Sequence, residues 1–181
     1  NADYLSATRL LPLRLYSGSA GSGSSQGLDG SRTLALLADD RSALKEVNEK
    51  LEDMFGIRLK ITRMNSTFVD EGGESHRYST NRLNVRVLGP EGDTKLQLPD
   101  IGFGASQVLP ILSAARTSQT VIVEEPESNL HPAAQAKLMS HIVDLTVGRA
   151  HSSGQTRPII METHSEHFLL SLLDEISNPE C

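Results

Sequence analysis

Acidic and histidine side chains follow two short apolar runs in the second half of the sequence. Residues 121–123 lead directly into Glu124 and Glu125, and residues 158–161 lead into a second polar group that contains His164. Apolar, mostly β-branched runs without polar alternation predict strands buried on both faces, as in parallel sheets. Ligands of open α/β sheets bind at the carboxyl ends of the strands. The pattern therefore predicts an acidic site for a divalent cation and an activated water; the alternative is a strand end that enters a solvated acidic turn.

A glycine-rich segment lies just before the first of these strands. It is made up of Gly102, Phe103, Gly104, Ala105, Ser106 and Gln107, and an apolar helix is predicted to follow over 108–115 with Pro110 in its first turn. Free N–H groups at a helix N-terminus, together with the helix dipole, favour a phosphate. A lone Gly-x-Gly is a weak signal, but its place directly before the Glu124 strand strengthens it. The alternative is that Ser106 and Gln107 only cap the helix.

The elements that must position these residues alternate between strand and helix. Helices are predicted over 132–147 and from 166 onward, so the order strand, helix, strand, helix predicts a parallel sheet with right-handed crossovers. In the first half, apolar residues at helical spacing predict a helix over 34–55, and alternating residues predict an antiparallel β meander over 57–98. The Gly/Ser loop 17–31 is predicted to be mobile. We therefore expect an α/β protein divided into residues 1–98 and residues 99–181.

Composition limits the classes of function. The net charge of -6, with acids and bases dispersed, argues against wholesale coating of nucleic acid, although a basic strand face could meet it locally. The only cysteine is Cys181, which indicates a reducing, cytoplasmic compartment. No apolar run approaches the length that spans a membrane.

The order of these motifs resembles a known family. The glycine-rich segment, the strand with Glu124-Glu125-Pro126-Glu127, then Leu130-His131-Pro132 and the strand with Thr163-His164-Ser165 are similar to the C-terminal half of a bacterial ABC-type or AAA ATPase related to the SMC, RecF and OLD families. The segment Tyr4-Leu5-Ser6-Ala7-Thr8-Arg9 is similar to what precedes this half. The resemblance implies a partial P-loop NTPase fold of the ABC-head type, with ATP and Mg²⁺ as cofactors.

The resemblance also implies a role for each matching residue. Glu124 stands where the Walker B acid organises Mg²⁺, although many relatives have Asp there. Glu125 matches the carboxylate that polarises the attacking water, and His164 matches the switch histidine at the γ-phosphate. Residues 102–107 correspond to the signature motif but depart from Leu-Ser-Gly-Gly-Gln, and Asn129 falls in the D-loop. The implied assembly is a homodimer of heads with ATP between them, with nucleic acid or an effector protein as a further partner.

The sequence contains no Walker A motif, because no Gly-Lys pair occurs in it. The motif lies N-terminal to these segments in the family, and this chain begins at Asn1 without a methionine. We therefore expect the C-terminal part of a longer ATPase, with poor ATP binding and no activity by itself. Two rival functions stay open at this point: a metal-dependent hydrolase that uses the Glu/His cluster, and a non-catalytic dimerisation module.

Overall fold

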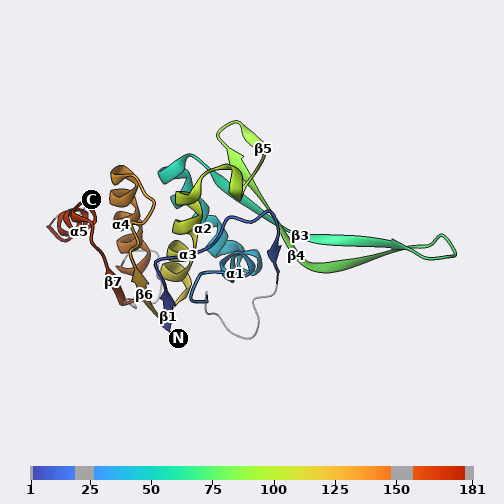
Figure 1. Cartoon of the computed structure of the whole chain (residues 1–181), viewed down its shortest axis with the longest axis horizontal. Helices are drawn as coiled ribbons and strands as arrows, with labels where there is room; N and C mark the ends of the chain where they lie inside the picture. The colour runs from blue at the N-terminus through green and yellow to red at the C-terminus, as the bar shows by residue number, and fades with distance from the viewer. Residues whose placement is uncertain (1, 19–26, 148–156, 178–181) are drawn as a thin grey trace.

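The computed structural model describes residues 2–18, 27–147 and 157–177 and has helices between two sheets (Figure 1). Strands β1 (Ala2–Leu5), β6 (Thr120–Glu124) and β7 (Ile159–Glu162) form a parallel sheet in the order β1-β6-β7. This sheet, its flanking helices and the antiparallel sheet that precedes them in the chain confirm the predicted α/β class.

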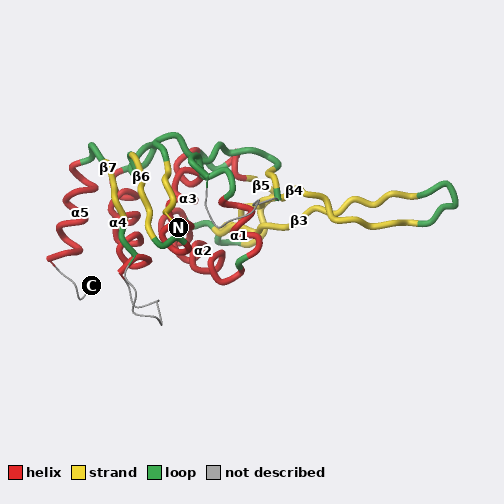
Figure 2. The backbone as a smooth tube through the Cα atoms, turned by 90° about the horizontal axis from the view of Figure 1, so that it is seen from below, coloured by secondary structure: helices red, strands yellow, loops and turns green. Residues whose placement is uncertain are grey.

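The parallel sheet has one covered face. Leu5 and Val123 are paired in register and fully buried. Helices α3 (Phe103–Thr117) and α4 (Pro132–Val147) lie along the sheet (Figure 2), and α3 contacts both β1 and β6. On the other face Tyr4 is 39% exposed and Ile160 is 59% exposed, and both align with Ile122. Among the described residues no helix covers this second face, although parallel sheets are normally covered on both.

The predicted helix over 34–55 is two helices, α1 (Thr33–Asp39) and α2 (Arg41–Phe55). The break falls at Asp40, whose side chain accepts hydrogen bonds from the N–H groups of Ser42 and Ala43, both 2.9 Å long. A short acid that satisfies the free N–H groups of a new helix is a strong N-cap, so it starts α2 instead of continuing α1. Gly56, which has a left-handed φ of 68°, ends α2 as its sequence predicts.

The antiparallel meander predicted over residues 57–98 is confirmed, and the short strand β2 pairs with it. Strands β2 (Tyr16–Ser17), β3 (Arg58–Val69), β4 (Ser75–Gly89) and β5 (Gly92–Gln97) form it, and a 3₁₀ turn, η1 (Leu98–Asp100), follows. The outer parts of β3 and β4 leave the body as a two-stranded arm (Figures 1 and 2). The sequence did not indicate this arm, because alternation with a buried face ends where the ribbon leaves the core.

Helix α3 corrects a second prediction. It begins at Phe103 rather than at residue 108, so the predicted glycine-rich turn is the first part of the helix and Pro110 lies in its interior. Gly102, with φ of 87°, is the residue at which the chain turns into the helix. Nearly all of α3 is buried, which explains why tertiary packing overrides the local preference of proline for a helix start.

The remaining predictions on the second half fit closely. Helix α4 has the predicted bounds, and α5 (Glu166–Ser177) packs against it, with Phe168 fully buried.

Most of the predicted mobile loop, residues 19–26, lies outside the described residues. Within the described part of the chain, no helix combines the length and the apolar character needed to span a membrane.

Candidate functional site

The carboxyl ends of β6 and β7 lie side by side. Glu124 pairs in register with Glu162, and the N–H of Glu125 donates to the carbonyl of Glu162 at 2.8 Å. The N–H of His164 donates to Glu127 Oε1 at 2.9 Å, which ties the segment after β7 to the segment after β6. The structure therefore brings the backbone positions of Glu124, Glu125 and His164 to one rim of the parallel sheet.

Glu124 is held by donors from the β1 strand and the loop after it. Its Oε1 accepts a hydrogen bond from the Tyr4 hydroxyl, and its Oε2 accepts one from the N–H of Ala7 at 3.3 Å. The hydrogen bond to Glu124 is the main cause that raises the pKa of Tyr4 above 10.0, followed by desolvation and by the charges of Glu124 and Glu162. A neutral tyrosine therefore fixes the direction of this carboxylate.

Glu125 has an unusual backbone, with a φ of 42°. This left-handed region costs a residue with a Cβ on the order of 1–3 kcal/mol. The carbonyl of Glu125 accepts from the N–H of Ser128 at 3.0 Å, and the Ser128 hydroxyl donates to Glu125 Oε2 at 2.8 Å. One serine therefore closes the turn and also orients the carboxylate that the sequence assigned to water activation.

Arg9 is fully buried and contacts the backbone of the rim from the interior of the protein. Its guanidinium donates to the carbonyls of Glu124 and Glu125, at 2.6 and 2.9 Å. Burial lowers the pKa of Arg9 to about 10, and the charges of Glu127 and Glu125 act in the opposite direction. Arg9 therefore supports the strand end from inside the protein.

The glycine-rich segment lies against the turn that contains Asn129. A Cβ on Gly104 would stand 3.0 Å from the carbonyl oxygen of Asn129 and 3.2 Å from Leu130, so a side chain there would push α3 and the turn apart. Asn129 itself has a left-handed φ of 63° and is exposed. The start of α3 and this turn therefore approach each other at the same rim.

The side chains of the segment are divided between surface and core. Phe103 is 39% exposed, while Ala105, Ser106 and Gln107 are buried. The Ser106 hydroxyl donates to the carbonyl of Phe103 at 2.7 Å within the helix, Gln107 bonds to Arg9 and Leu10, and no side chain caps α3 at Gly102, so the capping alternative is wrong. Gly102 and Phe103 are exposed and Gly104 is half-buried, so the accessible part of the segment is its beginning.

A pocket of about 420 Å³ opens between the end of α2 and the starts of α3 and α4. Its walls combine apolar and polar groups from all three helices and from the 129–131 turn. The lining residues are Met54, Phe55, Gly104, Asn129, Leu130, His131, Ala133, Ala134 and Lys137.

The rim has the donor chemistry that Mg²⁺ prefers. Magnesium takes oxygen ligands, commonly one or two carboxylates together with phosphate oxygens. Glu124 supplies two oriented carboxylate oxygens, and Glu127 Oε2 is buried without a hydrogen-bond partner. The chemistry of these carboxylate oxygens fits a magnesium ion.

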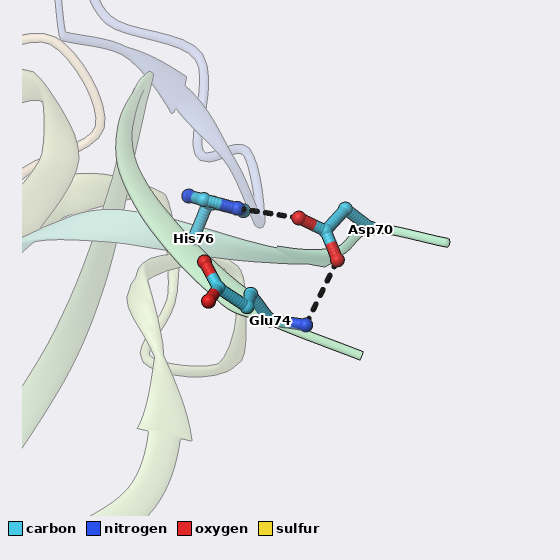
Figure 3. Close-up of side chains that lie close together, drawn as sticks. All are labelled: Asp70, Glu74 and His76. Atoms are coloured by element: carbon cyan, nitrogen blue, oxygen red, sulfur yellow. Dashed lines mark hydrogen bonds and ion pairs between the residues drawn. The ribbon is translucent and has the colours of Figure 1, made fainter. Parts of the chain in front are cut away.

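The donors proposed for a hydrolase do not converge in this way. Within residues 2–18, 27–147 and 157–177, the group with three ligand atoms inside 4.8 Å of one another is Asp70, Glu74 and His76, at the tip of the arm (Figure 3). There Asp70 Oδ2 lies 2.9 Å from His76 Nε2, and Asp70 Oδ1 accepts from the N–H groups of Gly72 and Glu74. These bonds are those of a tight turn and need no ion. The hydrolase alternative therefore has no support at the sheet rim.

Several residues at the rim were not assigned to it from the sequence. Tyr4 and Arg9 lie more than one hundred residues before the carboxylates they contact, and only the pairing of β1 with β6 joins them. The signal available in the sequence for this contact was an arginine, Arg9, a few residues after a short apolar segment. The other residues missed in these roles are Ser128, as the partner of Glu125, and Glu127, as the partner of the His164 N–H.

A parallel sheet with carboxylates at its rim and a glycine-containing helix start beside them is the arrangement at which ligands of open α/β sheets bind. A family model described as "AAA domain, putative AbiEii toxin, Type IV TA system" matches residues 18–171. The chain belongs to this family, and the predicted relation to AAA ATPases is confirmed. No curated protein matches the chain significantly.

Among solved structures, the chain is similar to the Smc head in the structure titled "Crystal structure of the SmcHead bound to the C-winged helix domain of ScpA". The TM-score is 0.49 at 10% sequence identity, and the match covers 81% of this chain. This chain spans 41% of that one.

Proposed function

We propose that this chain is the C-terminal half of an ATPase head, in which it supplies the Walker B strand, the catalytic carboxylate, the switch histidine and the signature segment. The observation that carries the proposal is the shared rim of β6 and β7, with Glu124 and Glu125 on one strand end and His164 after the next. The start of α3 adjoins this rim through Gly104.

Phosphoryl transfer needs positioning and charge stabilisation more than covalent chemistry from the protein. A bound magnesium would neutralise charge on the phosphates. Glu124 is the residue that holds it, and Tyr4 keeps that carboxylate in place. Glu125 orients a water for attack and accepts its proton, while Ser128 fixes the carboxylate. His164 contacts the terminal phosphate.

These residues contain no Gly-Lys pair and therefore no Walker A motif. In the proposed head, the phosphate cradle is supplied by a further segment that carries this motif. The uncovered sheet face with Tyr4, Ile122 and Ile160, and the unpaired edge of β7 among the described strands, support a further segment packing there. The signature segment faces outward at Phe103, which supports a second head as the partner that completes each site.

The experiment compares this chain with a polypeptide in which it is joined to its Walker A segment. We expect ATP turnover only from the joined protein, and no saturable ATP binding by the chain alone at micromolar concentration. Turnover by the joined protein must depend on Mg²⁺. Micromolar ATP affinity of the 181-residue chain by calorimetry, or a joined protein that binds ATP and never hydrolyses it, would refute the proposal.

A further inference from the structure

Arg9 is the largest fully buried side chain in the described part of the protein. Burying a charged group costs several kcal/mol unless hydrogen bonds replace its hydration. The guanidinium has five N–H donors in a rigid fork. Several directed hydrogen bonds, which an apolar side chain cannot make, must therefore compensate for the burial of Arg9.

The fork joins three separate segments of the chain. Nη1 donates to the carbonyls of Glu124, at 2.6 Å, and Ser6, at 3.0 Å. Nη2 donates to the carbonyl of Glu125 at 2.9 Å, and Nε donates to the carbonyl of Gln107 at 3.2 Å. The guanidinium is thus engaged with the exit of β1, the end of β6 and the first turns of α3.

The side chain of Gln107 also binds the backbone of the segment that contains Arg9. Its Oε1 accepts from the backbone N–H of Arg9 at 3.2 Å, and its Nε2 donates to the carbonyl of Leu10 at 3.1 Å. The side chain is 1% exposed, so it faces the interior and not the surface of the signature segment. Arg9 and Gln107 are therefore bonded to each other through backbone and side chain in both directions.

Arg9 contacts the rim at the carbonyl of Glu125. Glu125 is held in its left-handed conformation by bonds at both of its backbone polar groups: Glu162 binds the N–H, while Arg9 and Ser128 bind the carbonyl. A strained conformation persists only where the surroundings over-determine it. Removal of the guanidinium fork leaves Glu125 with the turn bond and the sheet bond alone.

We infer that Arg9 and Gln107 are positioning residues that make the start of α3 and the Glu124–Glu125 strand end one rigid unit. A displacement of the signature segment then displaces the catalytic carboxylate of the same chain. The catalytic part of this inference rests on the proposed function, whereas the mechanical link between the two segments does not.

The first test measures amide hydrogen exchange in the 181-residue chain. Arg9→Lys keeps the charge but replaces the planar fork with a single ammonium, so it cannot span three segments at once. We expect exchange at least about ten-fold faster both in residues 107–112 of α3 and at the Ser128 and Leu130 amides, with β3 and β4 unchanged. Faster exchange in only one of the two segments, or throughout the chain, would overturn the inference.

The second test measures turnover in the joined protein that contains a Walker A segment. Arg9→Lys should lower kcat about ten-fold or more and change the KM for ATP by less than about two-fold, because charged hydrogen bonds that orient Glu125 are lost while phosphate contacts remain. Gln107→Leu should lower kcat as well, and the double variant should be no worse than Arg9→Lys alone, as expected for residues that act as a unit.

Arg58→Lys is the matched control. Arg58 is exposed and its Nε lies 3.3 Å from Glu52 Oε1, outside the rim segments, so both readouts should keep their wild-type values. If Glu125→Gln abolishes turnover and Arg9→Lys does not change it, the inference fails and the proposed function stands. If the joined protein never hydrolyses ATP, the proposed function fails, and the exchange measurement still decides whether the two segments are linked.

Discussion

At the scale of single residues, the rim is a set of carboxylates whose positions are fixed by neighbours from distant parts of the chain. Glu124 and Glu125 could be predicted because they end an apolar strand in an acidic pair. Tyr4, which holds Glu124, could not, because the alternation in so short a strand does not show which neighbour it will meet. Only the register of β1 with β6 brings the two together.

The hydrogen bond between Tyr4 and Glu124 predicts a measurable change in titration. Glu124→Gln removes the charge that stabilises the neutral phenol, so the pKa of Tyr4 should move down toward its ordinary value of 10.0. The raised pKa means that this contribution to stability is present below that ordinary value and is lost as pH rises through the folded-state value. NMR titration of ring-labelled tyrosine measures it, with Tyr4→Phe used for assignment.

Tyr16 provides the internal reference for that experiment. Burial raises its pKa to about 12, and no rim carboxylate is among the causes, so the substitution should leave it in place. A Tyr4 pKa that stays unchanged in Glu124→Gln would show that the hydroxyl does not bind this carboxylate.

At the scale of elements, the sequence predicted the type of nearly every helix and strand but missed where some begin. The strand and helix around the rim, β6 and α4, follow apolar runs and a proline at a helix start, which are local signals. The start of α3 depends on contacts with other elements, so its early start at Phe103 and the interior Pro110 were not visible in the local pattern. The outer arm of β3 and β4 has no buried face to impose alternation.

Two glycines with the same backbone conformation test the packing around α3. Gly30 and Gly56 both have φ of +68°, but a Cβ on Gly30 would overlap the ring of Pro110, whereas one on Gly56 meets nothing within 4 Å. Gly56→Ala should lower the free energy of unfolding by about 1–2 kcal/mol, the cost of a left-handed residue with a Cβ. Gly30→Ala should cost about 1–3 kcal/mol more, from overpacking.

Urea unfolding of both variants under identical conditions measures the difference. Equal losses for Gly30→Ala and Gly56→Ala would mean that the loop before α1 does not press on α3 as the structure has it.

At the scale of the whole molecule, the parallel sheet is covered on one side, and α5 also exposes apolar side chains. The exposed apolar residues of these two elements are Ile160 on β7 and Leu169, Leu170, Leu173 and Ile176 on α5. Large exposed apolar patches mark interaction sites. The sequence predicted a missing Walker A segment from an absent motif, and the place where a segment could pack became visible only when β7 proved to be an edge strand among the described residues.

Substitutions of these exposed apolar residues should separate folding from association. The side chains of Ile160 and Leu173 are 59% and 58% exposed. Ile160→Thr and Leu173→Ser should therefore each change the stability of this chain by no more than about 0.5 kcal/mol. Both should weaken binding of a separately expressed Walker A segment, measured by calorimetry.

Val69→Thr, at a position 58% exposed at the far end of the arm, is the control for these two variants and should bind normally. Equal affinity in all three variants would place the partner elsewhere.

The most direct measurement is the ATP turnover number of the joined protein with Glu125→Gln, beside Glu91→Gln in the exposed turn between β4 and β5. Loss of a positioned general base lowers the rate by about 10²–10⁴-fold. The account predicts a fall in kcat of at least about 100-fold for Glu125→Gln with ATP still bound, and no change for Glu91→Gln. Turnover in Glu125→Gln equal to that of the unmodified protein would contradict the assignment of this strand end as the catalytic site.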